Sequence, residues 1–484
     1  MAGAGSHGQN GAARGAEAAP APRQWELAPE LPLAQLDAAA PDLTRLQVQL
    51  LANRGLRGEP ARQFMDAAWR AQPPQLLGMD AAVERIRRAA ERGEQVVVFG
   101  DFDVDGLTSC AVMLLALLAI GIAARAYVPA RDAAGRGPSE EAVRALAAEG
   151  TQLLVTTDCG TTNVAEVELA ARLGIDVIVT DHHLPQGPLA PAVALVNPRQ
   201  PGCPSSAANL AGVGVAFRVA EVLLAAGGSV DRIATLEALL DLVAIGTVGD
   251  MAPMTPENWA LVRAGLHRLN TRPRAGLLLL LDKAGVQMGT ATERDISFAV
   301  APRLNAAGRM GDPLVALHLL TTEDHDEATR LARELEQLNA ARQQATDAVV
   351  VAARAQVLAQ LQVSQPVLFA AGDGWPLGII GLVANRLTEE FDRPVIVVSR
   401  GETECRGSMR GPVGLNLVEA LGQRAELLRH FGGHAQAAGF TTAPGDLDTL
   451  VIHLRAAARQ ARGRTAGTPA IDAPRATDAG ELPA

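Results

Sequence analysis

The sequence predicts an α/β protein: a doubly wound, mostly parallel sheet joined by a long helix to a smaller α/β domain. Short β-branched runs alternate with helical stretches from about residue 95 onward. This alternation is typical of parallel strands joined by right-handed crossovers, with helices on both faces of the sheet. A polar, proline-free stretch of helical character then covers 322–363, and a second strand–helix alternation begins near residue 366.

A chain of 484 residues is too long for one hydrophobic core, so two or three domains are expected. We predict a main domain over 23–320, a connector helix over 321–364 and a smaller domain over 365–462. The Ala/Gly-rich residues 1–22 and the Pro/Ala-rich residues 463–484 have the low complexity of disordered tails.

Composition and charge restrict the functional class. The 43 Lys and Arg residues and 53 Asp and Glu residues give a net charge of −10. The chain therefore lacks the overall excess of basic residues that is typical of a protein that covers duplex DNA. A nucleic-acid substrate stays open, because a local groove and a metal site can bind it. Aromatic residues make up only 3% of the chain, which argues against a binding surface built mainly from stacked rings.

The cysteines and apolar runs predict a soluble, cytoplasmic protein. The four cysteines are far apart in the sequence and form no Cys-x-x-Cys pair, which is typical of a reducing compartment. The N-terminal 22 residues have no continuous apolar core of a signal peptide. The longest apolar run, 110–124, is shorter than the roughly 20 residues that span a bilayer. We expect no contact with a membrane.

Three carboxylates follow the first predicted strand, 96–99. Asp101, Asp103 and Asp105 alternate with other residues after Gly100, and a helix over 110–120 comes next. In an open α/β sheet, ligands bind at the carboxyl ends of the strands. A lone Asp-x-Asp there is most simply a solvated acidic turn. Three crowded carboxylates repel one another, and a divalent cation with oxygen ligands removes that conflict.

Two later strands and one helix end in similar side chains. Asp158 follows the strand over 153–157, the sequence Asp181-His182-His183 follows the strand over 177–180, and Asp250 follows an apolar helix. A lone histidine is more often structural than a ligand, but adjacent histidines after a strand-end aspartate are harder to place in a core. Carboxylates with imidazoles and no thiolate favour Mn²⁺ or Mg²⁺. Two such ions roughly 3.5–4 Å apart would stabilise the attacking and leaving oxygens at phosphorus.

Seven ordered motifs over residues 24 to 460 resemble the DHH phosphoesterase superfamily, and within it the RecJ-like single-strand-specific 5′→3′ exonucleases. Four of them look like the superfamily's core motifs: Gly-Asp-Phe-Asp-Val-Asp-Gly (100–106), Thr-Asp-Cys-Gly (157–160), Thr-Asp-His-His (180–183) and Gly-Thr-Val-Gly-Asp (246–250). The others are Asn-Arg-Gly (53–55), Ala-Pro-Arg-Leu-Asn-Ala-Ala-Gly-Arg (301–309) and Gly-Gly-His-Ala-Gln-Ala-Ala-Gly (432–439), the last similar to a DHH-associated domain signature.

The resemblance implies a role for each matching residue. Asp103, Asp105, Asp158, His182 and Asp250 match manganese ligands, and Asp101 is a less certain one. In the catalytic set of His183, Asp181 and Asp158, His183 would face the scissile phosphate and Asp181 would orient its neighbours. The implied substrate-binding residues are Arg303, Asn305 and Arg309 in a substrate-facing loop, Ser408 and Arg410, and Gly432, Gly433 and His434 in a Gly-rich turn. The plainer alternative for the arginines is pairing with a helix terminus or an acidic neighbour.

The sequence departs from the family pattern in two places. Trp375 is followed by Pro376, where family members usually carry histidine, and proline offers no side-chain ligand. RecJ proteins usually continue into an OB-fold that grips single-stranded DNA, whereas about 45 residues follow Gly439 here without a five-strand pattern. The chain is either a naturally short RecJ-like core, a truncated reading frame or an enzyme for shorter substrates. The loss of an OB-fold should weaken binding of long strands.

The resulting functional hypothesis is a phosphodiesterase with two Mn²⁺ or Mg²⁺ ions that degrades single-stranded DNA from its 5′ end to mononucleotides. A hydroxide at the Asp103, Asp105 and Asp158 cluster would attack phosphorus in line. Alternatives are a phosphodiesterase of short oligonucleotides or cyclic dinucleotides, a pyrophosphatase, and a non-catalytic DNA-binding relative. The 182 residues from Asp250 to Gly432 favour the RecJ-like arrangement over the short enzymes. A single-strand-binding protein or a helicase is an expected partner.

Overall fold

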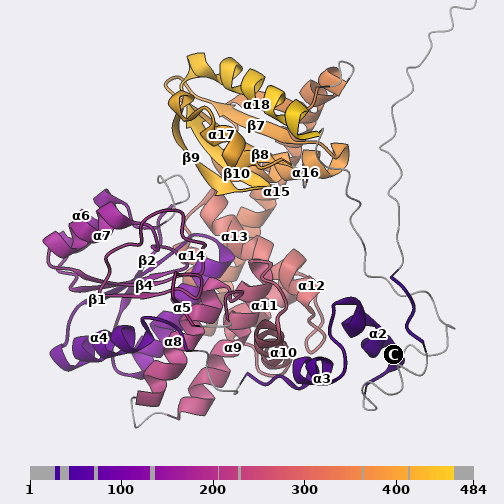
Figure 1. The fold of residues 1–484 in the computed structure, drawn as a ribbon. Coiled ribbons are helices and arrows are strands. Elements are labelled where there is room, and N and C mark those ends of the chain that lie inside the picture. The colour runs from indigo at the N-terminus through magenta and orange to yellow at the C-terminus, as the bar shows by residue number, and fades with distance from the viewer. Residues whose placement is uncertain are drawn as a thin grey trace, which may run out of the picture. The chain divides into compact units, whose positions relative to one another are not determined.

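The computed structural model describes residues 28–32, 43–69, 75–130, 137–204, 207–226, 231–361, 365–412 and 415–462. These residues form two compact units (Figure 1): a larger one over 32–352 and 372–383, and a smaller one built mainly from 353–371 and 384–462. The predicted tails, 1–22 and 463–484, lie outside the described residues. No helix in the described part of the chain is long and apolar enough to cross a membrane.

The larger unit contains a five-stranded parallel sheet with the order β2-β1-β3-β4-β5. Its strands are β1 (Val96–Gly100), β2 (Arg125–Tyr127), β3 (Leu153–Thr157), β4 (Asp176–Thr180) and β5 (Ala194–Val196). Every neighbouring pair is parallel, so the predicted fold class is confirmed. The short edge strand β5 was not predicted from the sequence.

Helices cover both faces of this sheet, because alternate strand residues belong to two different hydrophobic cores. Val96 and Val98 of β1 pack with α4 (Met79–Arg92), α5 (Val104–Ala119) and α8 (Gly212–Ala226). Val97 and Phe99 pack with α6 (Glu140–Ala148) and α7 (Val164–Arg172) on the other face (Figure 1). A strand that is buried on both faces reads as the continuous apolar run seen in the sequence.

A mainly helical layer completes the larger unit. It consists of α2 (Arg45–Asn53), α3 (Glu59–Asp66), α9 (Arg232–Gly249), α10 (Pro256–Thr271), α11 (Ala275–Lys283), α12 (Glu293–Asp295), the π-helix η1 (Ile296–Val300), α13 (Ala301–Met310) and α14 (Leu314–Thr321). Helix α15 (His325–Leu361) follows, and its residues are divided between the two units. The segment 301–309, predicted as a substrate-facing loop, is helical, which corrects that expectation. Its Pro302 is compatible with the first turn of a helix.

A buried ion pair joins three helices of this layer. The guanidinium of Arg274 donates to Asp241, which is fully buried on α9, and to the carbonyl groups of Ala238 and Leu320. We expect Arg274→Met to lower the free energy of unfolding by about 3–5 kcal/mol, because it leaves a buried carboxylate without its counter-charge. Urea denaturation measures this. The exposed pair of Arg172 and Glu168 provides the control, since Arg172→Met should cost well under 1 kcal/mol. Equal losses in the two variants would contradict the prediction.

The smaller unit contains a second five-stranded sheet with the order β6-β7-β8-β10-β9. Its elements are β6 (Leu368–Asp373), β7 (Val395–Arg400), β8 (Cys405–Arg410), α17 (Leu417–Gly422), the 3₁₀ turns η2 (Ala425–Leu427) and η3 (Pro444–Asp446), β9 (Leu428–His434), β10 (Ala437–Thr442) and α18 (Leu447–Arg462). The predicted Gly-rich turn at 431–435 is therefore mostly strand. Helix α16 (Leu377–Phe391) and the end of β6 are divided between the two units. The side-chain amides of Gln356 and Gln360 pair with the main chain of β6 and close that edge of the sheet.

Candidate metal centre

The side chains predicted as metal ligands converge at the carboxyl edge of the parallel sheet. Asp101, Asp158 and Asp181 directly follow β1, β3 and β4. Carboxylate and imidazole atoms gather there in three overlapping groups, within each of which the candidate ligand atoms all lie within 4.8 Å of one another. The groups are Asp101, Asp103 and Asp158; Asp158, His182 and His183; and Asp105, His182 and Asp250.

The turn after β1 is held by its own carboxylates. Asp103 caps α5, since its Oδ1 accepts the backbone N–H groups of Asp105 (3.1 Å) and Gly106 (3.2 Å). Asp101 is buried, and its Oδ1 accepts the N–H of Phe102. Gly106 has no room for a side chain, because a Cβ there would lie 2.5 Å from the carbonyl oxygen of Asp101. The turn can thus place several carboxylates close together only with glycine at this position.

Asp105 is tied to a distant helix. Its two carboxylate oxygens accept the N–H groups of Gly212 (2.7 Å) and Val213 (2.9 Å), which begin α8. A negative charge at a helix N-terminus is favourable. Burial nevertheless raises the pKa of Asp105, and the charge of Asp103 adds to this, while His182 and the two amides act in the opposite direction. A bound cation would offset the cost of keeping this carboxylate charged.

The ring of His182 is oriented by a main-chain carbonyl. Its Nδ1 lies 3.1 Å from the carbonyl oxygen of Leu210. Since a carbonyl only accepts, Nδ1 carries the proton and the lone pair is on Nε2. Nε2 is buried, has no hydrogen-bond partner among the described residues, and lies 3.1 Å from Oδ1 of Asp158. A ring nitrogen fixed in this way is the arrangement of an imidazole metal ligand.

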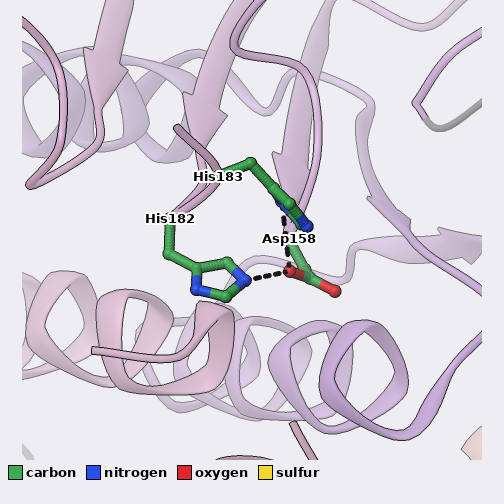
Figure 2. Close-up of side chains that lie close together, drawn as sticks. All are labelled: Asp158, His182 and His183. Atoms are coloured by element: carbon green, nitrogen blue, oxygen red, sulfur yellow. Dashed lines mark ion pairs between the residues drawn. The ribbon is translucent and has the colours of Figure 1, made fainter. Parts of the chain in front are cut away.

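Figure 2 shows the rings of His182 and His183 approaching the same carboxylate oxygen of Asp158, and the two ring centroids are 4.5 Å apart. Nδ1 of His183 lies 3.8 Å from the same Oδ1 that His182 approaches. Asp158 itself has a left-handed backbone conformation, with φ at 61°, which aspartate tolerates better than most residues. The sharp turn after β3 thereby directs this carboxylate toward a nitrogen of each ring.

Asp181 positions its neighbours and belongs to none of the three ligand groups. Its Oδ1 accepts the backbone N–H groups of His182 and His183 and, at 2.8 Å, Nδ1–H of the His183 ring, while Oδ2 accepts the N–H of Thr161. Burial acts to raise the pKa of Asp181. The hydrogen bonds from His183 and Thr161 outweigh it, so the pKa lies well below the usual range. Asp181 is thus a permanent carboxylate that orients His183.

Replacing Asp181 with asparagine tests this orienting role. We expect Asp181→Asn to lower kcat for phosphodiester hydrolysis by about 10–100-fold, the usual effect of losing a partner that orients a site residue. The amide keeps the side-chain shape but removes the charged acceptor that holds Nδ1–H of His183. Steady-state kinetics with saturating Mn²⁺ measure the effect. Unchanged kcat with a properly folded variant would show that His183 needs no charged partner.

Asp250 lies at the end of α9 as its C-cap residue. Its Oδ2 is 3.9 Å from Nδ1 of His182, and a third of its side chain is exposed. Its side chain is thus more accessible than those of Asp105, Asp158 and Asp181, which are buried. Asp250 therefore brings a fourth chain segment, the end of α9, to the carboxyl ends of β1, β3 and β4.

The three predicted substrate-binding residues on α13 have partners within the larger unit. Arg303 forms an ion pair with Glu336 at 2.7 Å, the acidic-neighbour alternative considered for it. Asn305 Oδ1 accepts the N–H of Val104 at the start of α5 (2.8 Å), and Nη1 of Arg309 donates to the carbonyl oxygen of Gly378. Asn305 therefore supports the acidic turn directly, a role that the sequence did not indicate.

Four of the five predicted substrate-binding residues of the smaller unit lie on one face of its sheet, and Gly433 does not. Arg410 is paired through Ala437 with His434, and Ser408 through Gly439 with Gly432. Side chains alternate along strands, so these residues present one face, whereas Met409, Ala438 and Phe440 turn to the hydrophobic core. Gly433 has the core-side parity and a φ of 133°, where a Cβ would meet the carbonyl oxygen of Ala437. Gly432 has neither this core-side parity nor a positive φ.

Several supporting residues were missed by the sequence reasoning. Asn197, fully buried just after β5, donates to the carbonyl oxygen of His183 and to Thr161. Leu210 and Gly212 act through backbone groups, which carry no side-chain signature. The one available signal was an asparagine directly after a short apolar run, Ala194–Val196.

The parallel sheet with carboxylates and imidazoles at its carboxyl edge defines a protein of the DHH phosphoesterase class. The family model of the DHH family, N-terminal domain, matches residues 95–247, and that of the DHHA1 domain matches residues 364–460. The chain belongs to the RecJ family.

Relatives with the name single-stranded-DNA-specific exonuclease RecJ are similar over most of the chain. The Bacillus subtilis (strain 168) protein is 40% identical over 415 residues, which is 84% of this chain and 51% of the relative. The Escherichia coli (strain K12) protein is 38% identical over 428 residues, which is 84% of this chain and 73% of the relative. The chain thus spans about half the length of the first and about three quarters of the second.

Solved structures agree with these relatives. RecJ from Thermus thermophilus in complex with Mn²⁺ matches with a TM-score of 0.78 and 30% identity, over 93% of this chain and 64% of that one. Another exonuclease RecJ bound to manganese matches with a TM-score of 0.69 and 34% identity, over 80% of this chain and 95% of that one.

Proposed function

We propose that this protein is a metal-dependent exonuclease that hydrolyses single-stranded DNA in the 5′→3′ direction to mononucleotides, in DNA repair and recombination. The observation that carries the proposal is the cluster of five carboxylates and two imidazoles at the carboxyl edge of the sheet. The names of the RecJ relatives support the substrate and the exonuclease activity by analogy.

The donor set fits Mn²⁺ or Mg²⁺. The set consists mainly of oxygen donors. The buried Nε2 of His182, whose lone pair points toward Asp158, supplies a nitrogen donor. We assign Asp101, Asp103, Asp105, Asp158, His182 and Asp250 as ligands of two ions. When bound, two cations would neutralise the phosphate and lower the pKa of a water. A structural zinc site is disfavoured because no cysteine belongs to the ligand groups found among the described residues.

The residues of the chain prepare the phosphate for in-line attack. The carboxylate of Asp181 accepts Nδ1–H of His183, which fixes the orientation of a ring assigned to face a non-bridging phosphate oxygen. Asp158 places a negative charge beside both imidazoles, which favours a cation at this position rather than a second anion. Asn305 keeps the acidic turn attached to α13 as the strand binds.

Binding of the strand is assigned to two sets of residues. On α13 they are Arg303, Asn305 and Arg309, and in the smaller unit Ser408, Arg410, Gly432, Gly433 and His434. The guanidinium of Arg410 donates to Oγ of Ser408, so the two present one hydrogen-bonding group suited to a phosphate. Arg303 would have to exchange Glu336 for a phosphate to take part. We also propose the domain division 23–320, 321–364 and 365–462, which the position of the DHHA1 match supports.

A cleavage time course tests the proposal. A 5′-labelled single-stranded 20-mer, its duplex and a dinucleotide are incubated with Mn²⁺, and each again with excess EDTA. We expect labelled mononucleotide from the single strand alone, and none with EDTA. Cleavage of the dinucleotide only would instead indicate an enzyme of short oligonucleotides, and product in EDTA would contradict the metal requirement.

A cytoplasmic location and a protein partner belong to the same proposal. An enzyme that degrades single strands needs them exposed, which a helicase provides and a single-strand-binding protein regulates. Co-purification of either protein with the full chain tests this. Activity that is indifferent to both proteins would remove them from the proposal.

A further inference from the structure

An exposed aromatic ring lies at the start of the helical segment that carries Asn305. Phe298 has 74% of its surface exposed, in a chain with only 3% aromatic residues. Among the described residues, the other exposed phenylalanine is Phe431 at 40%. A single exposed apolar side chain is ordinary at a protein surface, so its surroundings decide what it can do.

Phe298 is located in a π-helical turn. The turn η1 covers Ile296–Val300, between α12 and α13. Ile296 and Val300 are buried, whereas Phe298 between them turns to solvent. A π-turn is rare within helical segments and is frequent at functional sites. The widened turn therefore changes the direction of the ring without disturbing the core on either side.

A cation lies over the same ring. The guanidinium carbon of Arg294 is 5.4 Å from the centroid of Phe298. Arg294 is exposed and lies between two acidic residues, Glu293 and Asp295. The pKa of Asp295 is lowered mainly by its hydrogen bonds with Thr292, and the charge of Arg294 adds to this. Ring and cation together offer an aromatic face and a solvent-exposed positive charge. A single-stranded nucleic acid offers the complement, a base to stack and a phosphate to pair.

The ring belongs to the helical segment that reaches the acidic turn. Phe298 in η1 and Asn305 in α13 are seven residues apart on this continuous segment. Asn305 bonds to Val104, beside the acidic turn. At 1.5 Å per residue, Phe298 lies roughly 10 Å further along the segment. A strand held at the metal centre would reach the ring within a few nucleotides.

We propose that Phe298 and Arg294 form a stacking subsite that holds one base and an adjoining phosphate of the substrate strand, which rests on the proposed exonuclease function. Both are positioning residues, since neither belongs to the metal cluster. A base fits the pair better than an apolar protein surface does, because an exposed arginine in an apolar contact would lose its hydration without gaining a partner.

Steady-state kinetics on a single-stranded 20-mer test the subsite. We expect Phe298→Ala to raise KM for the 20-mer by roughly ten-fold or more, the range of losing one stacked base. Its kcat at saturating 20-mer should stay within two-fold of wild type, because the ring lies outside the metal cluster, and Phe298→Trp should restore KM. Leu118→Ala is the matched control: Leu118 is 62% exposed at the far end of α5, and its loss should change nothing.

A substrate with a missing base locates the contact. Scanning one abasic site along the 20-mer should raise KM for the wild type at one position, and Phe298→Ala should be insensitive at that position. Arg294→Gln should raise KM less and reduce its dependence on salt. An abasic profile that is identical in wild type and Phe298→Ala, or an unchanged KM for that variant, would overturn the subsite.

A binding experiment separates this inference from the exonuclease proposal. The fluorescence of Phe298→Trp is titrated with oligo(dT) in EDTA, and the signal of wild type, which has four tryptophans of its own, is subtracted. Quenching of the added tryptophan supports the subsite even if the enzyme cleaves no single strand, in which case only the exonuclease proposal fails. Absence of quenching overturns the subsite whatever the enzyme cleaves.

Discussion

Asp158→Asn is expected to lower kcat on single-stranded DNA by on the order of 10³-fold or more. Asp158 belongs to two of the three ligand groups, and its Oδ1 lies within 4 Å of a nitrogen of each histidine. Asparagine has the same shape and tolerates the same left-handed backbone, so the change removes charge and little else. Single-turnover cleavage with Mn²⁺ measures kcat, and calorimetry with Mn²⁺ measures affinity for the metal.

The stability of this variant provides a second, independent result. Removing one of several crowded carboxylates should leave the melting temperature of the metal-free protein unchanged or higher, because like charges are no longer forced together. Asp282→Asn, an exposed aspartate on α11, is the control and should alter neither activity nor stability. A metal-free Asp158→Asn protein that is strongly destabilised would mean that Asp158 holds the fold rather than the metal.

Gly212→Ala is expected to damage the same centre through packing alone. A Cβ at Gly212 would lie 2.7 Å from Cβ and 2.8 Å from Oδ1 of Asp158, closer than real Cβ contacts come. The N–H of Gly212 also donates to Asp105, so a shift of α8 would move both carboxylates. We expect a fall in kcat on the order of 10²-fold, and a loss of about 1–3 kcal/mol in the free energy of unfolding from overpacking.

A second glycine makes this prediction specific. Gly445 has open space around a built Cβ and no positive φ, so Gly445→Ala should be nearly neutral in activity and stability. Cleavage assays and urea denaturation of Gly212→Ala and Gly445→Ala distinguish the effect of the close contact at Gly212 from the general effect of replacing a glycine. Wild-type kcat in Gly212→Ala would show that α8 can withdraw without disturbing the carboxylates.

The sequence determined the fold class and most of the candidate metal cluster, because both depend on local patterns. The β-branched runs at 96–99, 153–157 and 177–180 predict strands without reference to the rest of the chain, and the alternating helices make them parallel. The residue that ends a parallel strand must lie at the carboxyl edge of the sheet. The convergence of Asp101, Asp158 and His182 therefore followed from where each strand stops.

Only the tertiary structure decided what each of these side chains contacts. Asp105 meets the N-terminus of α8, more than 100 residues away, and the tautomer of His182 depends on the carbonyl oxygen of Leu210. Arg303 faces Glu336. Backbone donors and acceptors are the same at every residue, so no sequence pattern identifies which of them folding will bring to a buried charge. Helix packing over long separations makes that selection.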